Sequence, residues 1–333
     1  MKKLPLIFLS LCCWACADEE ALPGTFITEQ IEEADLYSAG GVDYQRQLYF
    51  DLSSNQLKAQ NRRDAWDIAL SAQKGKPNLF VNPAMLVSVA GTGSRDFSQR
   101  FDPNDYKFEY ERADVFYERG QIMKRWQNPA QASEVFLINR GRNFENQERG
   151  YQKLQCLAYE NGQYRLRLAD LDNSNQKELT LTLDDRFNYQ FVNLDHPDSL
   201  LSLEPPKAEW DLLFSRYMER LFDGSDTLDY SVTGVLTNPY GTAAYAVDSS
   251  LSDSLPFSRL SLAEVEPDRF QQGPAAIGHD WKRFDLDAGV FTVDPKRYFF
   301  VRDAGEQIYR LRFTGFYSDE GRKGAVRFEY LPL

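Results

Sequence analysis

The chain has 333 residues, 42% hydrophobic and 26% charged, which is the composition of a globular protein rather than a disordered or fibrous one. Its formal charge of −12 argues against a nucleic-acid binder, because phosphate contacts need lysine and arginine. The two histidines, His196 and His279, are too few for histidine-rich metal sites and argue against most histidine-dependent hydrolases. Aromatic residues reach 14%, which favours β-strands.

The first 20 residues have the pattern of an export signal. Residues 1–3 are a positively charged start, and 4–15 form an apolar stretch too short to span a bilayer as a helix. Cys16 follows a small residue, as the acylated cysteine of a lipoprotein does. We predict a lipoprotein signal peptide over 1–15, a lipid anchor on Cys16 as the only membrane attachment, and an acidic tether over 16–35. Ordinary secretion without a lipid is the alternative.

Beyond the tether, short aliphatic and aromatic runs alternate with turn residues. Residues 179–183 show strict period-two alternation, and 297–330 read as a three-stranded antiparallel meander. Helical patterns are few and short, over 112–127 and 213–222. The sequence therefore predicts an all-β fold of mostly antiparallel sheets, sandwich-like, with few short helices. Further predicted strands lie over 47–52, 135–138 and 164–168.

A weak internal repeat divides the chain. Trp66-Asp67 recurs as Trp210-Asp211, and Asn82-Pro83 recurs as Asn238-Pro239, in the same order. A third similarity, between residues 151–155 and 309–313, follows in the same order. The repeat predicts two tandem similar β-domains, over 36–185 and 186–333, with chance similarity between β-rich sequences as the alternative.

Several segments resemble the HmuY-like lipoproteins of Bacteroidetes. The resemblance is strong over about 186–333 and weaker over 45–160. The acidic run after Cys16 also resembles the signal by which such bacteria export lipoproteins to the cell surface. The segments that carry the resemblance are 204–217, 232–238, 277–282, 298–317 and 324–331.

This resemblance implies an all-β layered fold and a binding function without catalysis. It implies a lipid-anchored location on the outer membrane, facing the cell exterior. There the founding members bind haem and pass it to a TonB-dependent receptor. The expected ligand is therefore haem, a related tetrapyrrole or another small apolar ligand, acquired for iron or haem uptake.

The resemblance also locates two axial haem ligands, which this chain lacks. They would fall in 250–270 and 284–287, and neither segment contains histidine or methionine. His279 is then the candidate for a displaced axial ligand, with a turn residue ahead of Trp281 as the alternative. We predict Tyr240, Tyr245 and Trp281 as pocket residues.

No motif of a hydrolase, a phosphate-binding loop or a metal site stands out, so we predict no catalytic residues, no metal site and no enzymatic activity. Once signal cleavage and lipidation are counted, Cys156 is the one free thiol, and we expect it to be buried and inert. The leading hypothesis is haem binding and delivery. The main alternative is a surface interaction or adhesion lipoprotein that kept the fold and lost the ligand. A carboxylate-dependent hydrolase is a third, weaker hypothesis.

Overall fold

The computed structural model describes residues 45–333 except 117, 223–224, 320 and 322. The predicted signal peptide, tether and lipidated Cys16 lie outside the described residues. Within that part of the chain, strands dominate and the two α-helices are short, α2 (Gln121–Arg125) and α3 (Ser249–Ser254). The all-β prediction is confirmed.

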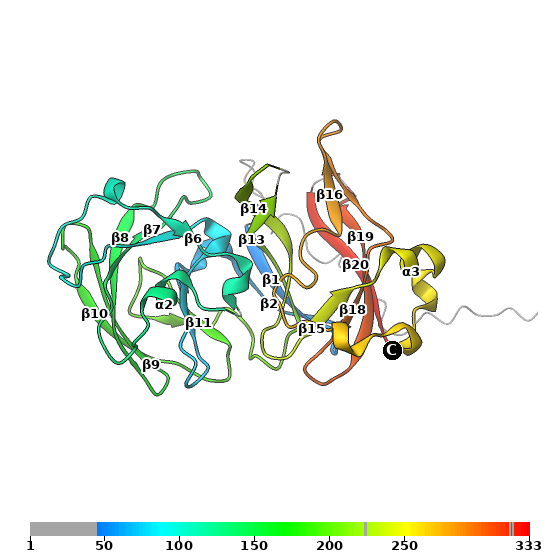
Figure 1. Ribbon diagram of the computed structural model, residues 1–333, viewed down its shortest axis with the longest axis horizontal. Coiled ribbons are helices and arrows are strands. Elements are labelled where there is room, and N and C mark those ends of the chain that lie inside the picture. The colour runs from blue at the N-terminus through cyan, green and yellow to red at the C-terminus, as the bar shows by residue number, and fades with distance from the viewer. Residues whose placement is uncertain (1–44, 117, 223–224, 320, 322) are drawn as a thin grey trace, which may run out of the picture.

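Four sheets are stacked as two sandwiches (Figure 1). In sandwich 1, one sheet has the order β12-β11-β3-β4 and the facing sheet the order β10-β9-β8-β7-β5-β6. Their bounds are β3 (Ile68–Ser71), β4 (Leu79–Val81), β5 (Ser88–Gly91), β6 (Glu109–Tyr110), β7 (Val135–Asn139), β8 (Tyr151–Glu160), β9 (Gln163–Asp170), β10 (Lys177–Thr182), β11 (Tyr189–Val192) and β12 (Leu200–Leu201). Aliphatic and aromatic side chains such as Leu70, Phe136 and Leu154 fill the space between these two sheets.

Sandwich 2 pairs the sheet β14-β13-β1-β2 with the sheet β15-β18-β19-β20. Its core includes Phe50, Leu212, Phe299 and Phe328. A separate hairpin, β16 (Lys282–Asp285) with β17 (Val290–Val293), projects from one end of this sandwich (Figure 1). The sheet strands are β1 (Arg46–Asp51), β2 (Gln56–Arg62), β13 (Leu212–Phe222), β14 (Thr227–Thr237), β15 (Ala243–Ala246), β18 (Tyr298–Arg302), β19 (Ile308–Tyr317) and β20 (Lys323–Pro332).

The helix predicted over 213–222 is wrong, because this segment is strand β13. Its first residues are buried on both faces, since β13 lies between the core of sandwich 2 and the junction with sandwich 1. A strand covered on both faces gives a continuous apolar run that periodicity cannot distinguish from a helix. Among the described residues of 112–127, the chain forms two short helices, η4 (Ala113–Phe116) and α2.

The first hairpin of each sequence repeat belongs to the sandwich of the other repeat. β1 and β2 precede sandwich 1 in the chain, yet β1 pairs with β13, placing Tyr49 opposite Leu213. Reciprocally, β11 and β12 follow the strands of sandwich 1, and β11 pairs with β3, placing Phe191 opposite Ala69. The sheet pairing therefore crosses the predicted boundary near residue 185 twice.

The Trp-Asp and Asn-Pro echoes occupy equivalent positions in the two sandwiches. The Asn82 side chain donates to the carbonyls of Trp66 (2.8 Å) and Arg63 (2.8 Å). The Asn238 side chain donates likewise to those of Trp210 (2.6 Å) and Lys207 (2.8 Å).

Each aspartate of these echoes binds the exchanged hairpin. Asp67 Oδ2 accepts from the Leu194 amide, and Asp211 Oδ2 accepts from the Leu52 amide, both at 2.9 Å. The same pair of residue types thus fastens each hairpin to the sandwich of the other repeat.

Glu204 secures the exchanged hairpin β11–β12 and predicts a pH effect on stability. Its buried carboxylate accepts from the amides of Asn188 and Tyr189, and burial raises its pKa to about 8. The unfolded carboxyl ionises near 4.5, so between these values the folded state binds more protons than the unfolded state. The contribution is fully present below pH 4.5 and is lost as the pH rises through 8.

We therefore expect the free energy of unfolding to fall between pH 5 and pH 8, by up to ~1.4 kcal/mol per pH unit for this carboxyl. Urea unfolding of the Glu204→Gln variant should give a shallower slope than the parent chain. Glu109→Gln, at an exposed carboxyl of β6, is the matched control. Equal slopes for Glu204→Gln and the parent would contradict this account.

Candidate functional site

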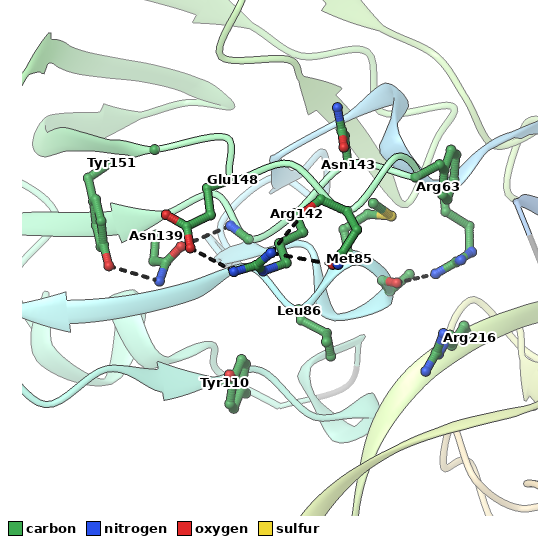
Figure 2. Close-up of a pocket in the computed structure, with 15 residues that line it drawn as sticks. Arg63, Met85, Leu86, Tyr110, Asn139, Arg142, Asn143, Glu148, Tyr151 and Arg216 are labelled. Carbon is green, nitrogen blue, oxygen red and sulfur yellow. Dashed lines mark hydrogen bonds and ion pairs between the residues drawn. The ribbon is translucent and has the colours of Figure 1, made fainter. Parts of the chain in front are cut away.

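The candidate site is a cleft of about 410 Å³ where the two sandwiches meet (Figure 2). We call it the arginine cleft. Sandwich 1 supplies most of its walls, from the η2 turn (Pro83–Met85), from Tyr110 and from the loop that joins β7 to β8. β13 of sandwich 2 contributes Arg216. The lining residues are Arg63, Ala84, Met85, Leu86, Tyr110, Asn139, Gly141, Arg142, Asn143, Phe144, Asn146, Glu148, Gly150, Tyr151 and Arg216.

Local sequence fixes the η2 side of the cleft. Asn82 caps the turn, its Oδ1 accepting from the Ala84 amide at 2.9 Å, and Pro83 favours the start of the helical turn. Leu86 ends the turn with φ +57°, a left-handed conformation that is rare for a branched side chain. This backbone holds the Leu86 side chain 40% exposed at the cleft wall. Such local strain is a feature of binding sites.

The opposite wall comes close to this turn because of one glycine. Gly141 has φ +67°, and a Cβ atom there would lie 2.6 Å from the Met85 carbonyl oxygen. Only glycine permits both the conformation and the close approach. The loop from β7 to β8 therefore lies directly against η2.

Three guanidinium groups give the cleft its positive character. Arg142 forms an ion pair with Glu148 at 2.7 Å, and buried Arg63 donates to the Ala84 carbonyl. Arg216 donates from Nε to the Ser231 hydroxyl at 2.6 Å, and among the described residues no carboxylate pairs with it. Arg216 is thus a cation available to an anionic ligand.

Apolar and aromatic side chains complete the lining. Phe144 lies beneath Arg63, whose guanidinium carbon is 5.4 Å from the ring centroid. Tyr110 and Tyr151 are 38% and 37% exposed, so both rings are accessible to a ligand. The Tyr151 hydroxyl accepts from the Asn139 amide at 3.4 Å. The cleft therefore combines accessible aromatic rings and an aliphatic side chain with cations. Ligand pockets commonly have such a mixture of apolar surface and a few polar groups.

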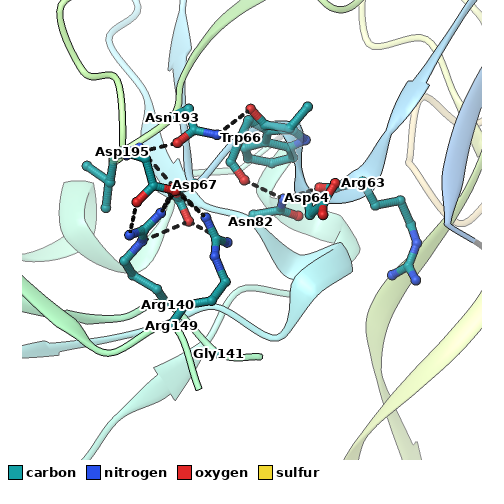
Figure 3. Close-up of polar contacts among 12 residues, drawn as sticks. Arg63, Asp64, Trp66, Asp67, Asn82, Arg140, Gly141, Arg149, Asn193 and Asp195 are labelled. Carbon is teal, nitrogen blue, oxygen red and sulfur yellow. Dashed lines mark hydrogen bonds and ion pairs between the residues drawn. The ribbon is translucent and has the colours of Figure 1, made fainter. Parts of the chain in front are cut away.

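A buried ion cluster holds both ends of the β7–β8 loop (Figure 3). Asp67 is fully buried and pairs with Arg140 (Nη2 to Oδ2, 3.0 Å) and with Arg149 (Nη1 to Oδ1, 2.8 Å). The Arg140 guanidinium also binds Asp195 at 2.6 Å, and this hydrogen bond lowers the pKa of Asp195. Because the two arginines flank residues 141–148, the cluster fixes the wall of the cleft before any ligand binds.

The predicted pocket residues do not gather at one site. Trp281 is fully buried and stacks on Phe313, with ring centroids 4.1 Å apart, so it is a core residue. Tyr245 is also buried, packed against Phe270 and Phe300. Tyr240 is 48% exposed and lines a different cleft.

His279 is half-buried in the turn before Trp281, where its carbonyl accepts from the Lys282 amide at 3.4 Å. Burial and the nearby Lys282 lower its pKa. The His279 imidazole is not among the residues that line the arginine cleft. Cys156 is buried, which raises the pKa of its thiol and agrees with the expectation of an inert cysteine.

Sequence reasoning did not select the residues that form this cleft. Arg63 and Arg216 are 153 positions apart in the sequence (216 − 63). They line the same cleft because β13 packs against η2. One signal was available: a cation precedes each Trp-Asp pair by three positions, Arg63 before Trp66 and Lys207 before Trp210. Within the described residues there is no group of three or more histidine, cysteine, aspartate or glutamate side chains suited to a metal ion.

No helix in the described part of the chain has the length and apolar character needed to cross a membrane. Comparison with curated proteins gives no match. Three solved structures are similar, at low identity. Apo PinO from Porphyromonas gingivitis is 11% identical, with a TM-score of 0.28, and the match covers 87% of this chain and 92% of that one.

Two further structures come from Bacteroides. A protein of Bacteroides fragilis NCTC 9343 assigned as a lipoprotein is 13% identical (TM-score 0.23; 53% of this chain and 92% of that one). A protein of Bacteroides vulgatus ATCC 8482 assigned as an HmuY-like heme-binding protein is 12% identical (TM-score 0.24; 61% and 92%). The model of the HmuY protein family matches residues 43–330, nearly the whole described chain. The chain therefore belongs to the HmuY family.

Proposed function

We propose that this protein captures haem or a related tetrapyrrole in the arginine cleft and delivers it for uptake, without catalysing a reaction. The observation that carries the proposal is that Arg216, which has no carboxylate partner among the described residues, lines the same cleft as the exposed side chains of Tyr110, Tyr151 and Leu86. A tetrapyrrole is flat and apolar with carboxylates on one edge, which is the complement of such a lining. Membership of the HmuY family supports the same ligand class.

The cleft offers a chemical partner for each part of this ligand. Carboxylates would pair with Arg216 and with Arg142, another arginine of the lining, since guanidinium binds carboxylate in a two-pronged manner. The macrocycle would pack against Leu86. Tyrosine and methionine both serve as axial ligands of haem iron, and the cleft contains Tyr110, Tyr151 and Met85. The family's histidine positions are therefore not required for iron binding here.

The setting of this function follows from the sequence. We propose that Cys16 carries the lipid anchor, that the protein faces the exterior from the outer membrane, and that a TonB-dependent receptor accepts the ligand. The acidic run after Cys16 supports surface export. These proposals rest on the resemblance of the leader to lipoprotein signals and on family membership.

A haem titration of the full chain tests the ligand. We expect a saturable shift of the Soret band, and we expect Arg216→Glu to weaken the affinity by at least about tenfold, because a carboxylate would then face the ligand's carboxylates. Arg220→Glu is the matched control on the same strand, outside the cleft lining. Tyr110→Phe and Tyr151→Phe should identify the axial phenol through loss of its charge-transfer signature.

His279→Ala is measured alongside, and we expect its Soret shift to equal that of the parent chain. Loss of the shift in this variant alone would make His279 the axial ligand and contradict the proposed site. Absence of any saturable change, with oxidised and with reduced haem, would overturn the tetrapyrrole proposal.

The second candidate function is a surface interaction module without a small ligand. It is favoured by apolar side chains at the ends of two hairpins of sandwich 2: Leu286 is 86% exposed, Phe222 70% and Leu228 61%. Both hairpins project from the same end of the molecule (Figure 1). Exposed apolar side chains that gather at one end of a molecule are a feature of interaction sites. The haem titration separates the two functions, because this one predicts no Soret shift.

A further inference from the structure

A second cleft, of about 980 Å³, also lies at the junction of the two sandwiches. We call it the lysine cleft. Its lining includes three cations, Lys76, Arg119 and Lys207, and three accessible aromatic side chains, Tyr159, Phe187 and Tyr240. It shares no lining residue with the arginine cleft.

The internal repeat relates the two clefts. In the arginine cleft the Asn-Pro turn of the first repeat faces β13, the Trp-Asp strand of the second. In the lysine cleft, Pro239 from the Asn-Pro turn of the second repeat lines the same cleft as Ser71 at the end of β3, the Trp-Asp strand of the first. Arg63 and Lys207, three positions before their Trp-Asp pairs, each line one cleft. The junction therefore provides two equivalent positions for binding, with different side chains.

The charge of the lysine cleft contrasts with that of the whole chain. Lys76, Arg119 and Lys207 form no ion pair with a carboxylate among the described residues, whereas most other arginines of this acidic protein do. Glu118 is the one carboxylate in the lining. Three cations against one anion, in a chain of charge −12, favour an anionic ligand.

The aromatic side chains of the lysine cleft restrict the shape of the ligand that it can bind. Tyr240 is 48% exposed, and Lys207 Nζ lies 5.2 Å from its ring centroid, so a cation and a ring are presented together. The position of the Tyr159 side chain is fixed by a hydrogen bond, in which its hydroxyl accepts from the Gly75 amide at 3.1 Å. Accessible amides, Gln73 and Gln272, complete the lining. A suitable ligand has flat ring faces, negative charges at intervals and many hydroxyl groups.

We propose that the lysine cleft binds an acidic oligosaccharide, a chain of uronate-type sugars. The C–H faces of the sugar rings pack on Tyr240 and Phe187, the carboxylates pair with the three cations, and the hydroxyls bond to the glutamine amides. A neutral glycan leaves the cations unused. An acidic peptide supplies the charges but lacks the ring faces. The volume, more than twice that of the arginine cleft, accommodates several sugar units.

Calorimetric titration of the full chain with a galacturonate hexamer tests this site. We expect saturable binding that weakens with salt, and at least tenfold weaker binding to neutral maltohexaose and to hexaglutamate. The Arg119→Glu/Lys207→Glu variant should lose at least tenfold in affinity, and Tyr240→Ala should lose several-fold. The charge-matched control is Lys107→Glu/Arg259→Glu, two exposed cations outside both clefts, which should stay within about twofold of the parent.

The results of this oligosaccharide titration can be distinguished from those of the haem titration. The Arg119→Glu/Lys207→Glu variant should keep the parent's thermal unfolding midpoint and Soret titration, since neither residue lines the arginine cleft. No saturable heat with the hexamer would overturn the proposal. So would an equal loss in the control variant, which would indicate only the general charge of the protein, or hexaglutamate binding as tightly as the sugar.

Discussion

Replacement of Asp67 by asparagine should lower the free energy of unfolding by about 3 kcal/mol, because it leaves the buried Arg140 and the half-buried Arg149 with only the exposed carboxylate of Asp195 as a shared partner. Asp67 is fully buried, and it pairs with both Arg140 and Arg149. It also accepts from the Leu194 amide on the exchanged hairpin. The substitution therefore weakens the wall of the arginine cleft and the attachment of β11–β12 together.

The internal repeat provides a matched control for this prediction. Asp211 is the equivalent residue in sandwich 2, but its side chain binds the Leu52 amide and the Thr242 hydroxyl instead of arginine. Burial raises its pKa to about 7. Asp211→Asn removes one acceptor and leaves no buried cation unpaired, so its cost should be about 1–2 kcal/mol. Urea unfolding at neutral pH compares the two variants, and an equal cost would contradict the importance of the arginine pairs.

The second large effect is expected for Trp281→Ala, which should cost about 3–5 kcal/mol. The indole is fully buried, stacks on Phe313 and meets Phe316 edge-on at 5.7 Å. Its removal creates a cavity beneath the β16–β17 hairpin that the neighbouring rings cannot fill. At a temperature where the variant remains folded, its tetrapyrrole affinity should match that of the parent chain.

Tyr240→Ala is the comparison for Trp281→Ala. Tyr240 is half exposed, and its loss should cost less than about 1 kcal/mol. Thermal unfolding and haem titration of both variants give the result. If Trp281→Ala were nearly neutral for stability and abolished haem binding, Trp281 would be a pocket residue, as the sequence predicted, and not part of the core.

Sequence patterns were sufficient for the fold class because they report local structure. The alternation over 179–183 corresponds to β10, and the C-terminal meander corresponds to β18, β19 and β20. The Trp-Asp and Asn-Pro echoes also correspond to real equivalent hydrogen bonds. The helix prediction for 213–222 was wrong because of tertiary packing. Burial of both faces of β13 removes the alternation of polar and apolar residues that identifies a strand.

The pairing of strands that are far apart in the chain could not be predicted from the sequence. Nothing local to 46–62 reveals that this hairpin pairs with β13 rather than with β3, because either strand follows a Trp-Asp pair and presents an apolar surface. The arginine cleft depends on that same exchange, since it combines η2 with Arg216 on β13. Trp281 could not be placed from the sequence, because an indole suits both a core and a ligand pocket, and only its burial distinguishes the two.

The most direct test of the proposed function is the position of the iron in crystals grown with haem, located by anomalous diffraction at the iron edge. We expect one iron site within the arginine cleft, with the haem carboxylates near Arg216. An iron site at the β16–β17 hairpin or beside His279 would contradict the cleft, even if the protein binds haem. No iron density at full haem saturation of the solution would contradict tetrapyrrole capture itself.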